Sequence, residues 1–465
     1  GESVVYSFAS TGYQPLGGLA QGKDGNFYGT VSAGGAFQQG AFFMLTPAGS
    51  YTLLHSFDGT DGGEPEGQLA LGGDGNFYGV TLGGGAHDDG TVFKVTPAGV
   101  LTVLYSFAGS DGKNPVGGLT LGSDGSFYGT TNAGGSGGLG AVFKITTAGA
   151  LTTLHSFSSD EGSQPYGALA QGTDGNFYGT TSAGGAHSEG SVFKITPAGS
   201  LSVLHSFDPS SEGYTPQAGL VQAADGNFYG TTTTGGSGSK FTTEGTVFRI
   251  TPAGTLTTLY SFGLINSDGS QNTHGYEPDA ALSLGGDGNL YGSTLNGGTL
   301  FSITTGGSLT TLYTFSGGSG DGAGPDSPLL LAADGNFYGT TENGGVNGGG
   351  TVFKLSGVGA APPAAPVLNA PVAGDGQVAL SWSAVSGVSS YSVYQGTAAG
   401  GESSTPVKTG ISGTGVTLTG LSDGITYYFK VGAAVAGASG TLSNEVSATP
   451  LAVPGRVSGL AAHAG

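Results

Sequence analysis

Short apolar runs bounded by glycine or proline recur along most of the chain. In the copy that follows Pro65, the runs cover residues 67–71, 76–81, 91–96 and 101–107. Each run is rich in β-branched and aromatic residues, which is typical of strands. Asp74-Gly75 lies between the first two runs and Pro97-Ala98-Gly99 between the last two, and both favour tight turns. No stretch has a 3.6-residue apolar period, so the pattern predicts four antiparallel strands and essentially no helix.

The motif Asp-Gly-Asn-Phe-Tyr-Gly, or a close variant, occurs in seven copies that begin at residues 24, 74, 124, 174, 225, 287 and 334. Repeats of this size indicate units that bury their apolar faces against one another. Four strands in each of seven copies predict an all-β fold, a seven-bladed β-propeller with four-stranded blades over residues 1–357.

The two ends of the repeat region predict how the ring closes. Residues 4–8 match the fourth strand of a copy but precede the first copy, and the seventh copy ends with its third strand at residues 351–355. We therefore expect the N-terminal strand to complete the last blade, which leaves no unpaired sheet edge.

Two phenylalanines and one leucine recur in all seven copies. We expect them to be buried between blades or near the ring axis, each contributing about 1.5–3 kcal/mol to stability. They are Phe8, Phe57, Phe107, Phe157, Phe207, Phe262 and Phe315, then Phe43, Phe93, Phe143, Phe193, Phe248, Phe301 and Phe353, and Leu19, Leu69, Leu119, Leu169, Leu220, Leu282 and Leu329.

The motifs Asp-Gly-Asn-Phe-Tyr-Gly-Thr-Thr and Gly-Thr-Val-Phe-Lys-Ile-Thr-Pro-Ala-Gly resemble the GloVer tandem repeat of bacterial surface proteins. The resemblance covers roughly residues 1–357. It implies an extracellular or bacterial cell-surface location and, in many members, a C-terminal surface anchor. It implies no known activity. No anchor signal is recognised in these residues, which leaves the mode of attachment open.

The remainder of the chain predicts a second fold. Residues 358–365 are a linker rich in Pro and Ala, and residues 366–450 resemble a fibronectin type III β-sandwich. Residues 378–382 match its second strand, residues 391–394 its third, and residues 421–427 the corner formed by a tyrosine hydroxyl. Trp382 is expected in the core. Residues 451–465 resemble the start of a further, incomplete fibronectin-like module, or a strand that completes a neighbour.

Composition excludes several partners. Only 9% of the 465 residues are charged, and the net charge is −20. So few Lys and Arg cannot neutralise a phosphate backbone, which argues against nucleic acid and against anionic membranes. The chain has no cysteine, hence no disulfide and no thiolate metal site. No apolar run approaches the roughly 18 residues of a membrane helix, so no direct membrane insertion is expected.

The long, variable loops are the candidate binding face, because binding residues concentrate on loops held by a rigid scaffold. One position immediately after a repeated proline differs between the copies, and three of its occupants are carboxylates. Glu66, Asp279 and Asp326 would converge at the mouth of the channel and hold Ca²⁺, or they are solvated charges on the rim. No cofactor is otherwise required. The seven residues at this position, called the ring positions below, are Leu16, Glu66, Val116, Tyr166, Gln217, Asp279 and Asp326.

Aromatic residues outside the repeated pattern are candidate ligand-binding residues. Exposed rings stack on sugar faces or on partner proteins, and the alternative is packing within the loops. The candidates are Tyr13, Tyr166, Tyr214, Tyr276 and Phe37, with Phe241 nearby.

Histidines and turn aspartates are assigned mainly structural roles. His87-Asp88-Asp89 and His187-Ser188-Glu189 could bind metal or transfer protons, but loop packing is the preferred interpretation. His55, His155 and His205 alternate with tyrosine in the fourth strand, so we expect them to be structural. The repeated Asp-Gly-Asn segments have the residues that a tight turn requires, and this explains them without Ca²⁺.

The sequence therefore predicts a non-enzymatic extracellular protein that recognises a glycan or a surface protein through its long loops, or packs with copies of itself into a surface layer or filament. The alternative is a carbohydrate-active enzyme, a polysaccharide lyase or glycosidase acting at the channel mouth, which rests on analogy between folds.

Overall fold

The computed structural model describes all residues except 10–11, 211, 237–243, 264–273, 319, 360–362, 386–387, 389, 436–437 and 453–465. The chain divides into two compact units, Gly1–Ser356 and Gly357–Gly465. The predicted linker falls partly, and the predicted incomplete module mostly, outside the described residues.

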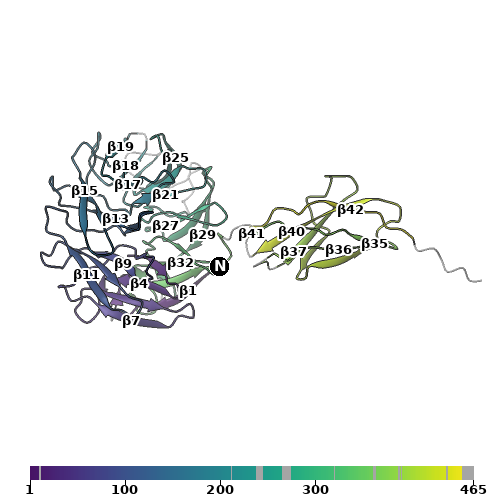
Figure 1. Cartoon of the computed structure of the whole chain (residues 1–465), viewed down its shortest axis with the longest axis horizontal. Coiled ribbons are helices and arrows are strands. Elements are labelled where there is room, and N and C mark those ends of the chain that lie inside the picture. Colours follow the sequence, from purple (N-terminus) through teal and green to yellow (C-terminus); the bar gives the residue numbers. More distant parts are fainter. Residues whose placement is uncertain are drawn as a thin grey trace, which may run out of the picture. The chain divides into compact units, whose positions relative to one another are not determined.

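The first unit contains seven four-stranded antiparallel sheets, as predicted for a propeller. The sheets follow one another around a centre in the order of the sequence (Figure 1). Blade 1 is β3 (Leu19–Gln21), β4 (Phe27–Val31), β6 (Ala41–Leu45) and β7 (Tyr51–Ser56). Blade 2 is β8 (Ala70–Leu71), β9 (Phe77–Thr81), β10 (Thr91–Val95) and β11 (Leu101–Ser106). Blade 3 is β12 (Thr120–Leu121), β13 (Phe127–Thr131), β14 (Ala141–Ile145) and β15 (Leu151–Ser156).

The remaining blades have the same strand order. Blade 4 is β16 (Ala170–Gln171), β17 (Phe177–Thr181), β18 (Ser191–Ile195) and β19 (Leu201–Ser206). Blade 5 is β21 (Val221–Gln222), β22 (Phe228–Thr232), β24 (Thr246–Ile250) and β25 (Leu256–Ser261). Blade 6 is β26 (Ser283–Leu284), β27 (Leu290–Thr294), β28 (Thr299–Ile303) and β29 (Leu309–Thr314). Blade 7 is β31 (Leu330–Leu331), β32 (Phe337–Thr341), β34 (Thr351–Leu355) and β1 (Glu2–Ser7).

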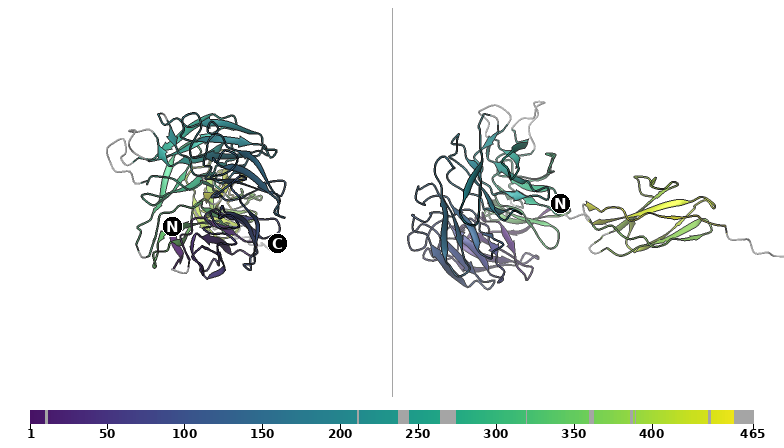
Figure 2. Two further views of the ribbon diagram at one scale, coloured as in Figure 1. Left: turned by 90° about the vertical axis from the view of Figure 1, so that its left-hand side faces the viewer. Right: turned by 45° about the horizontal axis from the view of Figure 1, so that its top comes forward.

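The N-terminal strand closes the ring, which confirms the prediction. β1 pairs antiparallel with β34, and Val4 lies opposite Phe353. Figure 2 shows the N-terminus beside the late strands of the first unit from two further directions. Because β1 takes the place of a fourth strand, blade 7 joins residues from the two ends of the repeat region.

Aromatic pairs connect neighbouring blades. The ring of Phe107 at the end of β11 packs edge-on against Phe143 of β14, with 5.2 Å between centroids. Nearer the axis, Tyr78 of β9 stacks on Phe127 of β13 at 4.1 Å. All four side chains are buried. The repeated phenylalanines thus form the predicted core between blades.

Glycines at the inner ends of the blades allow neighbouring chains to approach closely. A Cβ atom added to Gly67 would lie 2.9 Å from the carbonyl oxygen of Val116 in the next blade. A Cβ atom on Gly117 would lie 2.7 Å from the carbonyl oxygen of Tyr166. Glycine is therefore required sterically where the blades crowd around the axis.

Short ladders stabilise three of the loops between blades. They join β2 (Gly12–Tyr13) to β5 (Ala33–Gly34), β20 (Gly213–Tyr214) to β23 (Thr234–Gly235), and β30 (Gly322–Ala323) to β33 (Asn343–Gly344). Other blades have single β-bridges, such as Gly63 with Gly83.

The second unit is an Fn3-like sandwich of two sheets. One sheet contains β35 (Val372–Gly374), β36 (Gln377–Ser381) and β39 (Gly415–Thr419). The other contains β38 (Lys408–Ile411), β37 (Ser390–Gly396), β40 (Tyr427–Val435), β41 (Ala438–Ser439) and β42 (Val446–Ala448). Trp382 is buried in its core, as predicted. The hydroxyl of Tyr427 accepts a hydrogen bond from the Ser422 amide at 3.1 Å, which forms the predicted corner.

Within the described residues, no helix combines the length and the apolar character that crossing a bilayer requires.

Candidate functional site

A cavity of about 590 Å³ lies where the inner ends of the blades meet. Its volume is typical of small-molecule sites, which span about 300–1,000 Å³. All seven ring positions line it, together with inner-strand leucines such as Leu169 and Leu220. Every ring position is partly exposed. The sequence-predicted positions are thus gathered in one place.

The backbone just before each ring position explains this convergence. Glu64 is left-handed, with φ 54°, and it precedes Pro65. Its amide donates to the carbonyl of Gln39 in blade 1, and its carbonyl accepts from the amide of Leu82 in blade 2. The equivalent residues of the other blades also have positive φ, namely Gln14, Asn114, Gln164, Thr215, Glu277 and Gly324.

Six of these seven residues are not glycine, so the conformation costs energy. A left-handed non-glycine residue costs roughly 1–2 kcal/mol. The surrounding hydrogen bonds hold the chain in this shape, and each ring position follows two residues later. The hydrogen-bonded backbone therefore fixes the location of each ring position.

The wall of the cavity is electrostatically uneven. Blades 2, 6 and 7 contribute the carboxylates Glu66, Asp279 and Asp326, whereas blades 3, 4 and 5 contribute Val116, Tyr166 and Gln217. No Lys, Arg or His is among the described residues that line it. One side can accept hydrogen bonds, and the other offers apolar and aromatic surface.

The pKa values of all three carboxyl groups are raised. Burial, and then the charge of Glu277, raises the pKa of Asp279 to about 6. Burial, followed by the charges of Asp279, Glu342 and Glu66, raises the pKa of Asp326 to about 8. Burial, and then Glu64, also raises the pKa of Glu66. These side chains are partly exposed to the cavity, while its walls remove much of the water that would stabilise their charges.

The Ca²⁺ site predicted at Glu66, Asp279 and Asp326 stays a prediction. In the described part of the chain, no group of three or more Asp, Glu or His side chains could hold a metal ion. Blade 1, which contributes Leu16, lies between Glu66 of blade 2 and Asp326 of blade 7. Each carboxylate can therefore accept hydrogen bonds from a different part of a ligand.

The structure does not bring the candidate aromatic residues together. Tyr166 lines the cavity. Tyr214 and Tyr276 are partly buried against the cores of their blades. Tyr13 lies in β2 opposite Ala33, and Phe37 is 59% exposed outside the cavity. Phe241 lies outside the described residues.

The polar clusters weighed in the sequence serve local structure. Asp88 accepts from the Gly84 amide at 2.9 Å, and Asp89 pairs with Lys113 at 2.8 Å. In the first Asp-Gly-Asn turn, Asp24 accepts from the Asn26 side chain at 2.8 Å and from the Tyr28 hydroxyl at 2.9 Å. The turn itself therefore uses these carboxylate oxygens.

Sequence reasoning missed two features, one beside the cavity and one in the loops that lead to it. Glu342 follows β32, and its charge raises the pKa of Asp326, although its repeat position gives no sign of this proximity. An acidic residue five positions before most ring positions hydrogen-bonds to a His or Tyr of the preceding fourth strand, as in His55–Asp61. The recurrence of this acid at residues 61, 111, 161, 212 and 321 is the signal that could have found it.

Comparison with known proteins identifies the repeat and the fold. The model of the Gloeobacter/Verrucomicrobia repeat matches residues 14–243 and 237–364. No curated protein matches the chain. A streptogramin B lyase structure is 15% identical with a TM-score of 0.54, over 77% of this chain and 97% of that one. A catalytically inactive His-to-Ala variant of virginiamycin B lyase from Staphylococcus aureus with quinupristin is 15% identical with a TM-score of 0.53, over 76% and 98%.

A shorter match covers the second unit. An Fn3-like protein from Clostridium thermocellum is 29% identical over 18% of this chain and 86% of that protein, with a TM-score of 0.16. The likeness to the two lyases establishes the propeller fold and no activity.

Proposed function

This chain belongs to the Gloeobacter/Verrucomicrobia repeat family, and we propose that its propeller is a non-enzymatic binding module that takes the end of a glycan into the axial cavity. The observation that carries the proposal is the variation among the ring positions. Seven copies keep the two repeated phenylalanines, the repeated leucine and the Asp-Gly turn, yet the residue facing the cavity is Leu, Glu, Val, Tyr, Gln, Asp or Asp. A purely structural ring would need no such variety.

The chemistry of the wall fits a saccharide. Carboxylates accept hydrogen bonds from sugar hydroxyls, and the ring of Tyr166 can stack on the apolar face of a pyranose. Gln217 both donates and accepts. At neutral pH, Asp279 with its pKa of about 6 is charged, and no Lys, Arg or His among the described lining residues would compensate an acidic sugar, so the preferred glycan is neutral or carries an amine.

The location we propose is extracellular, at the bacterial surface. The resemblance of the repeat to surface proteins supports it, as does an acidic chain with only 11 Lys and Arg. The Fn3-like unit would serve as a spacer.

A glycan array tests the binding function, followed by calorimetry with the best ligand. Removing the Tyr166 ring should weaken binding up to about tenfold, because an aromatic contact contributes about 0.5–1.5 kcal/mol. Tyr214→Ala is the matched control, since that ring packs outside the cavity. Absence of binding by the wild type, or equal losses of affinity in the Tyr166 and Tyr214 variants, would contradict the proposal.

A second candidate is a carbohydrate-active enzyme, a lyase or glycosidase. The pKa of Asp326 is about 8 and that of Asp279 about 6. Carboxyl groups whose pKa values differ in one cavity can act as acid and base. The S. aureus lyase variant is inactive after a His-to-Ala substitution, whereas no histidine is among the residues lining this cavity.

Mass spectrometry of array-positive oligosaccharides after incubation distinguishes the two functions. The binding proposal expects intact oligosaccharide. Cleavage by the wild type that is abolished by Asp326→Asn, with binding retained, would establish the enzyme instead.

A further inference from the structure

Three histidines occupy equivalent places in β7, β15 and β19, and each bonds to an acidic residue in the loop that follows. The ring Nε2 atoms of His55, His155 and His205 lie 2.7, 2.9 and 2.6 Å from carboxylate oxygens of Asp61, Glu161 and Glu212, respectively. All three pairs are partly buried. We call these the His–carboxylate pairs.

Other blades make the same link with tyrosine. The hydroxyl of Tyr105 in β11 donates to Asp111, and the hydroxyl of Tyr313 in β29 donates to Asp321 at 3.2 Å. The hydrogen bond to Asp111, together with burial, raises the pKa of Tyr105 to about 12. Tyrosine therefore provides a link whose donor keeps one charge state across the physiological range.

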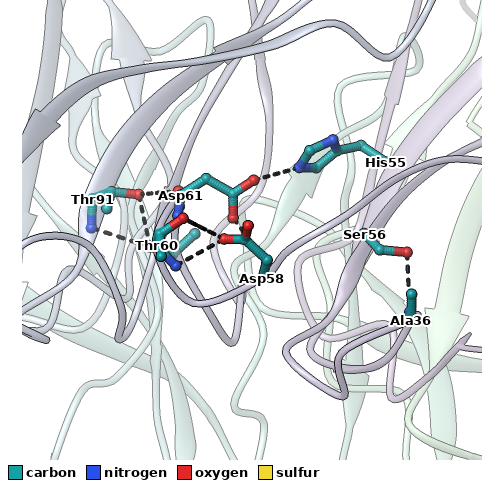
Figure 3. A network of polar contacts seen from close by, with 8 residues as sticks. Ala36, His55, Ser56, Asp58, Thr60, Asp61 and Thr91 are labelled. Atoms are coloured by element: carbon teal, nitrogen blue, oxygen red, sulfur yellow. Dashed lines mark hydrogen bonds and ion pairs between the residues drawn. The ribbon is translucent and has the colours of Figure 1, made fainter.

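The acidic residue also fixes the loop backbone, as Figure 3 shows for Asp61. Its carboxylate accepts from the amide of Asp58 at 3.0 Å, and its carbonyl accepts from the hydroxyl of Thr91 at 3.3 Å. In blade 4, the carbonyl of Glu161 likewise accepts from the Ser191 hydroxyl at 2.6 Å. The loop is thus tied to both its own strand and the next blade.

Each of these loops leads directly to the cavity. The ring position is the fifth residue after the acid, so Asp61 leads to Glu66, Glu161 to Tyr166 and Glu212 to Gln217. Three of the seven ring positions are therefore carried by loops with a His–carboxylate pair, while Val116 and Asp326 are carried by loops with a tyrosine link.

The described groups around each imidazole include one charged partner, its acid. In the described residues, each ring makes one ion pair, with its acid. The facing residues on the neighbouring strands are Phe42, Val142 and Val192, which do not titrate. Phe57, Phe157 and Phe207 pack edge-on against the rings.

The other charged groups in these loops are also mainly acidic. Asp58 caps the Asp61 amide beside His55. Beside His205, the backbone carbonyl of Asp208 accepts a hydrogen bond from the Glu212 amide. Hydrogen bonds from Ser210, and then the charge of His187, lower the pKa of the Asp208 carboxyl group. Although burial opposes it, hydrogen bonds from His155 and Ser158 hold the pKa of Glu161 below its ordinary value.

We propose that the three His–carboxylate pairs are pH-dependent links that hold the Glu66, Tyr166 and Gln217 loops more firmly at mildly acidic pH than at alkaline pH. Histidine changes charge between pH 5 and 8, and a charge-assisted hydrogen bond is roughly twice as strong as a neutral one. A pair whose imidazole gains a proton at lower pH therefore becomes a charge-assisted link. The tyrosine links do not change.

Hydrogen–deuterium exchange of the full chain at pH 5.5 and pH 8 tests the links without any ligand. After correction for the intrinsic pH dependence of exchange, protection of residues 57–66, 157–166 and 207–217 should increase about fivefold at pH 5.5. Residues 107–116, which follow Tyr105, should not change. An equal response in all four loops would overturn the proposal.

Histidine and tyrosine occupy equivalent positions in different blades, so exchanging one for the other provides matched variants. His55→Tyr, His155→Tyr and His205→Tyr together should abolish the pH response, and Tyr105→His in an otherwise wild-type ring should create one at residues 107–116. Persistence of the response in the triple variant would contradict the proposal. If the triple variant fails to fold, Tyr105→His alone decides it, because no gain of response would also contradict it.

The effect of the His–carboxylate pairs on glycan binding rests on the proposed function and is measured separately. Asp279 and Asp326 also change protonation between pH 5.5 and pH 8, so the comparison is made between the wild type and the triple variant. With an array-positive oligosaccharide, the ratio of affinity at pH 5.5 to affinity at pH 8 should be larger for the wild type than for the triple variant. Lack of any binding would overturn the proposed function while leaving the exchange result intact.

Discussion

The ring of Phe8 packs edge-on against the ring of Phe43, with 5.3 Å between centroids and 69° between planes. Phe8 follows the closing strand β1 of blade 7, and Phe43 lies in β6 of blade 1. The same contact joins Phe107 to Phe143 inside the array, at 5.2 Å and 67°. The closing interface therefore reproduces the geometry of an internal one, as expected of a ring without a weak seam.

Phe8→Ala tests this equivalence. Because both phenylalanines are buried, Phe8→Ala and Phe107→Ala should each lower the free energy of unfolding by about 3–5 kcal/mol. Chemical denaturation provides the measurement. A large loss for Phe107→Ala with almost none for Phe8→Ala would mean that the N-terminal strand does not close the ring in solution.

Gly67→Ala tests the crowding at the axis. The added methyl group would lie 2.9 Å from the Val116 carbonyl oxygen, and we expect a loss of about 1–3 kcal/mol in the free energy of unfolding. Gly73→Ala in the same blade is the control, because nothing lies within 4 Å of its added Cβ atom. Equal stability of the two variants in urea would show that the inner ends of the blades can separate at little cost.

Thr215→Gly tests the strained backbone before the ring positions. Thr215 is β-branched and has φ 56°, so glycine should raise the free energy of unfolding by about 1 kcal/mol. Gly324, the equivalent residue of blade 7, has φ 63°, and Gly324→Ala should have the opposite effect. A destabilised Thr215→Gly protein in thermal melts would contradict the interpretation of strain.

The raised pKa values predict how stability depends on pH. A carboxyl group whose pKa is higher in the folded state binds extra protons there, so the free energy of unfolding falls as the pH rises. For Asp326, the free energy of unfolding should fall between about pH 4 and about pH 8. For Asp279, the fall should end at about pH 6. Asp326→Asn should therefore flatten the fall between pH 6 and 8 in thermal melts.

Asp334→Asn is the control for this series. Burial alone would raise the pKa of Asp334, but hydrogen bonds from Asn336, Lys354 and Tyr338 together outweigh it and lower the pKa to about 2. The contribution of Asp334 to stability is therefore lost only below about pH 4. Asp334→Asn should leave the pH dependence of stability above pH 6 unchanged. An unchanged slope in Asp326→Asn would mean that this carboxyl group is well hydrated.

Much of the fold was predictable because the same pattern of strands and turns occurs seven times in the sequence. The alternation of Asp-Gly and Pro-Ala-Gly turns with short strands predicted the blades, and residues 4–8 predicted the closure. The Fn3-like unit was recognisable from Trp382 and from Tyr427, whose hydroxyl accepts from the Ser422 amide. These features are local or strictly periodic, and that is why sequence reasoning reaches them.

The site was predictable only where it follows the repeat. The ring positions converge because each follows the same proline. The placement of Tyr214 and Tyr276 depends on how each loop folds back onto its own blade, which the residue pattern does not specify. The Ca²⁺ site stays a prediction, because the repeat places three carboxylates at one mouth without specifying how far apart they lie.

The location of a bound oligosaccharide tests the central claim most directly. A crystal structure with the best array ligand should place a sugar ring against Tyr166, with hydroxyl or amine groups toward Asp279 and Asp326. A ligand bound at Phe37, on the outer strands or on the Fn3-like unit, with the axial cavity holding only water, would contradict the account.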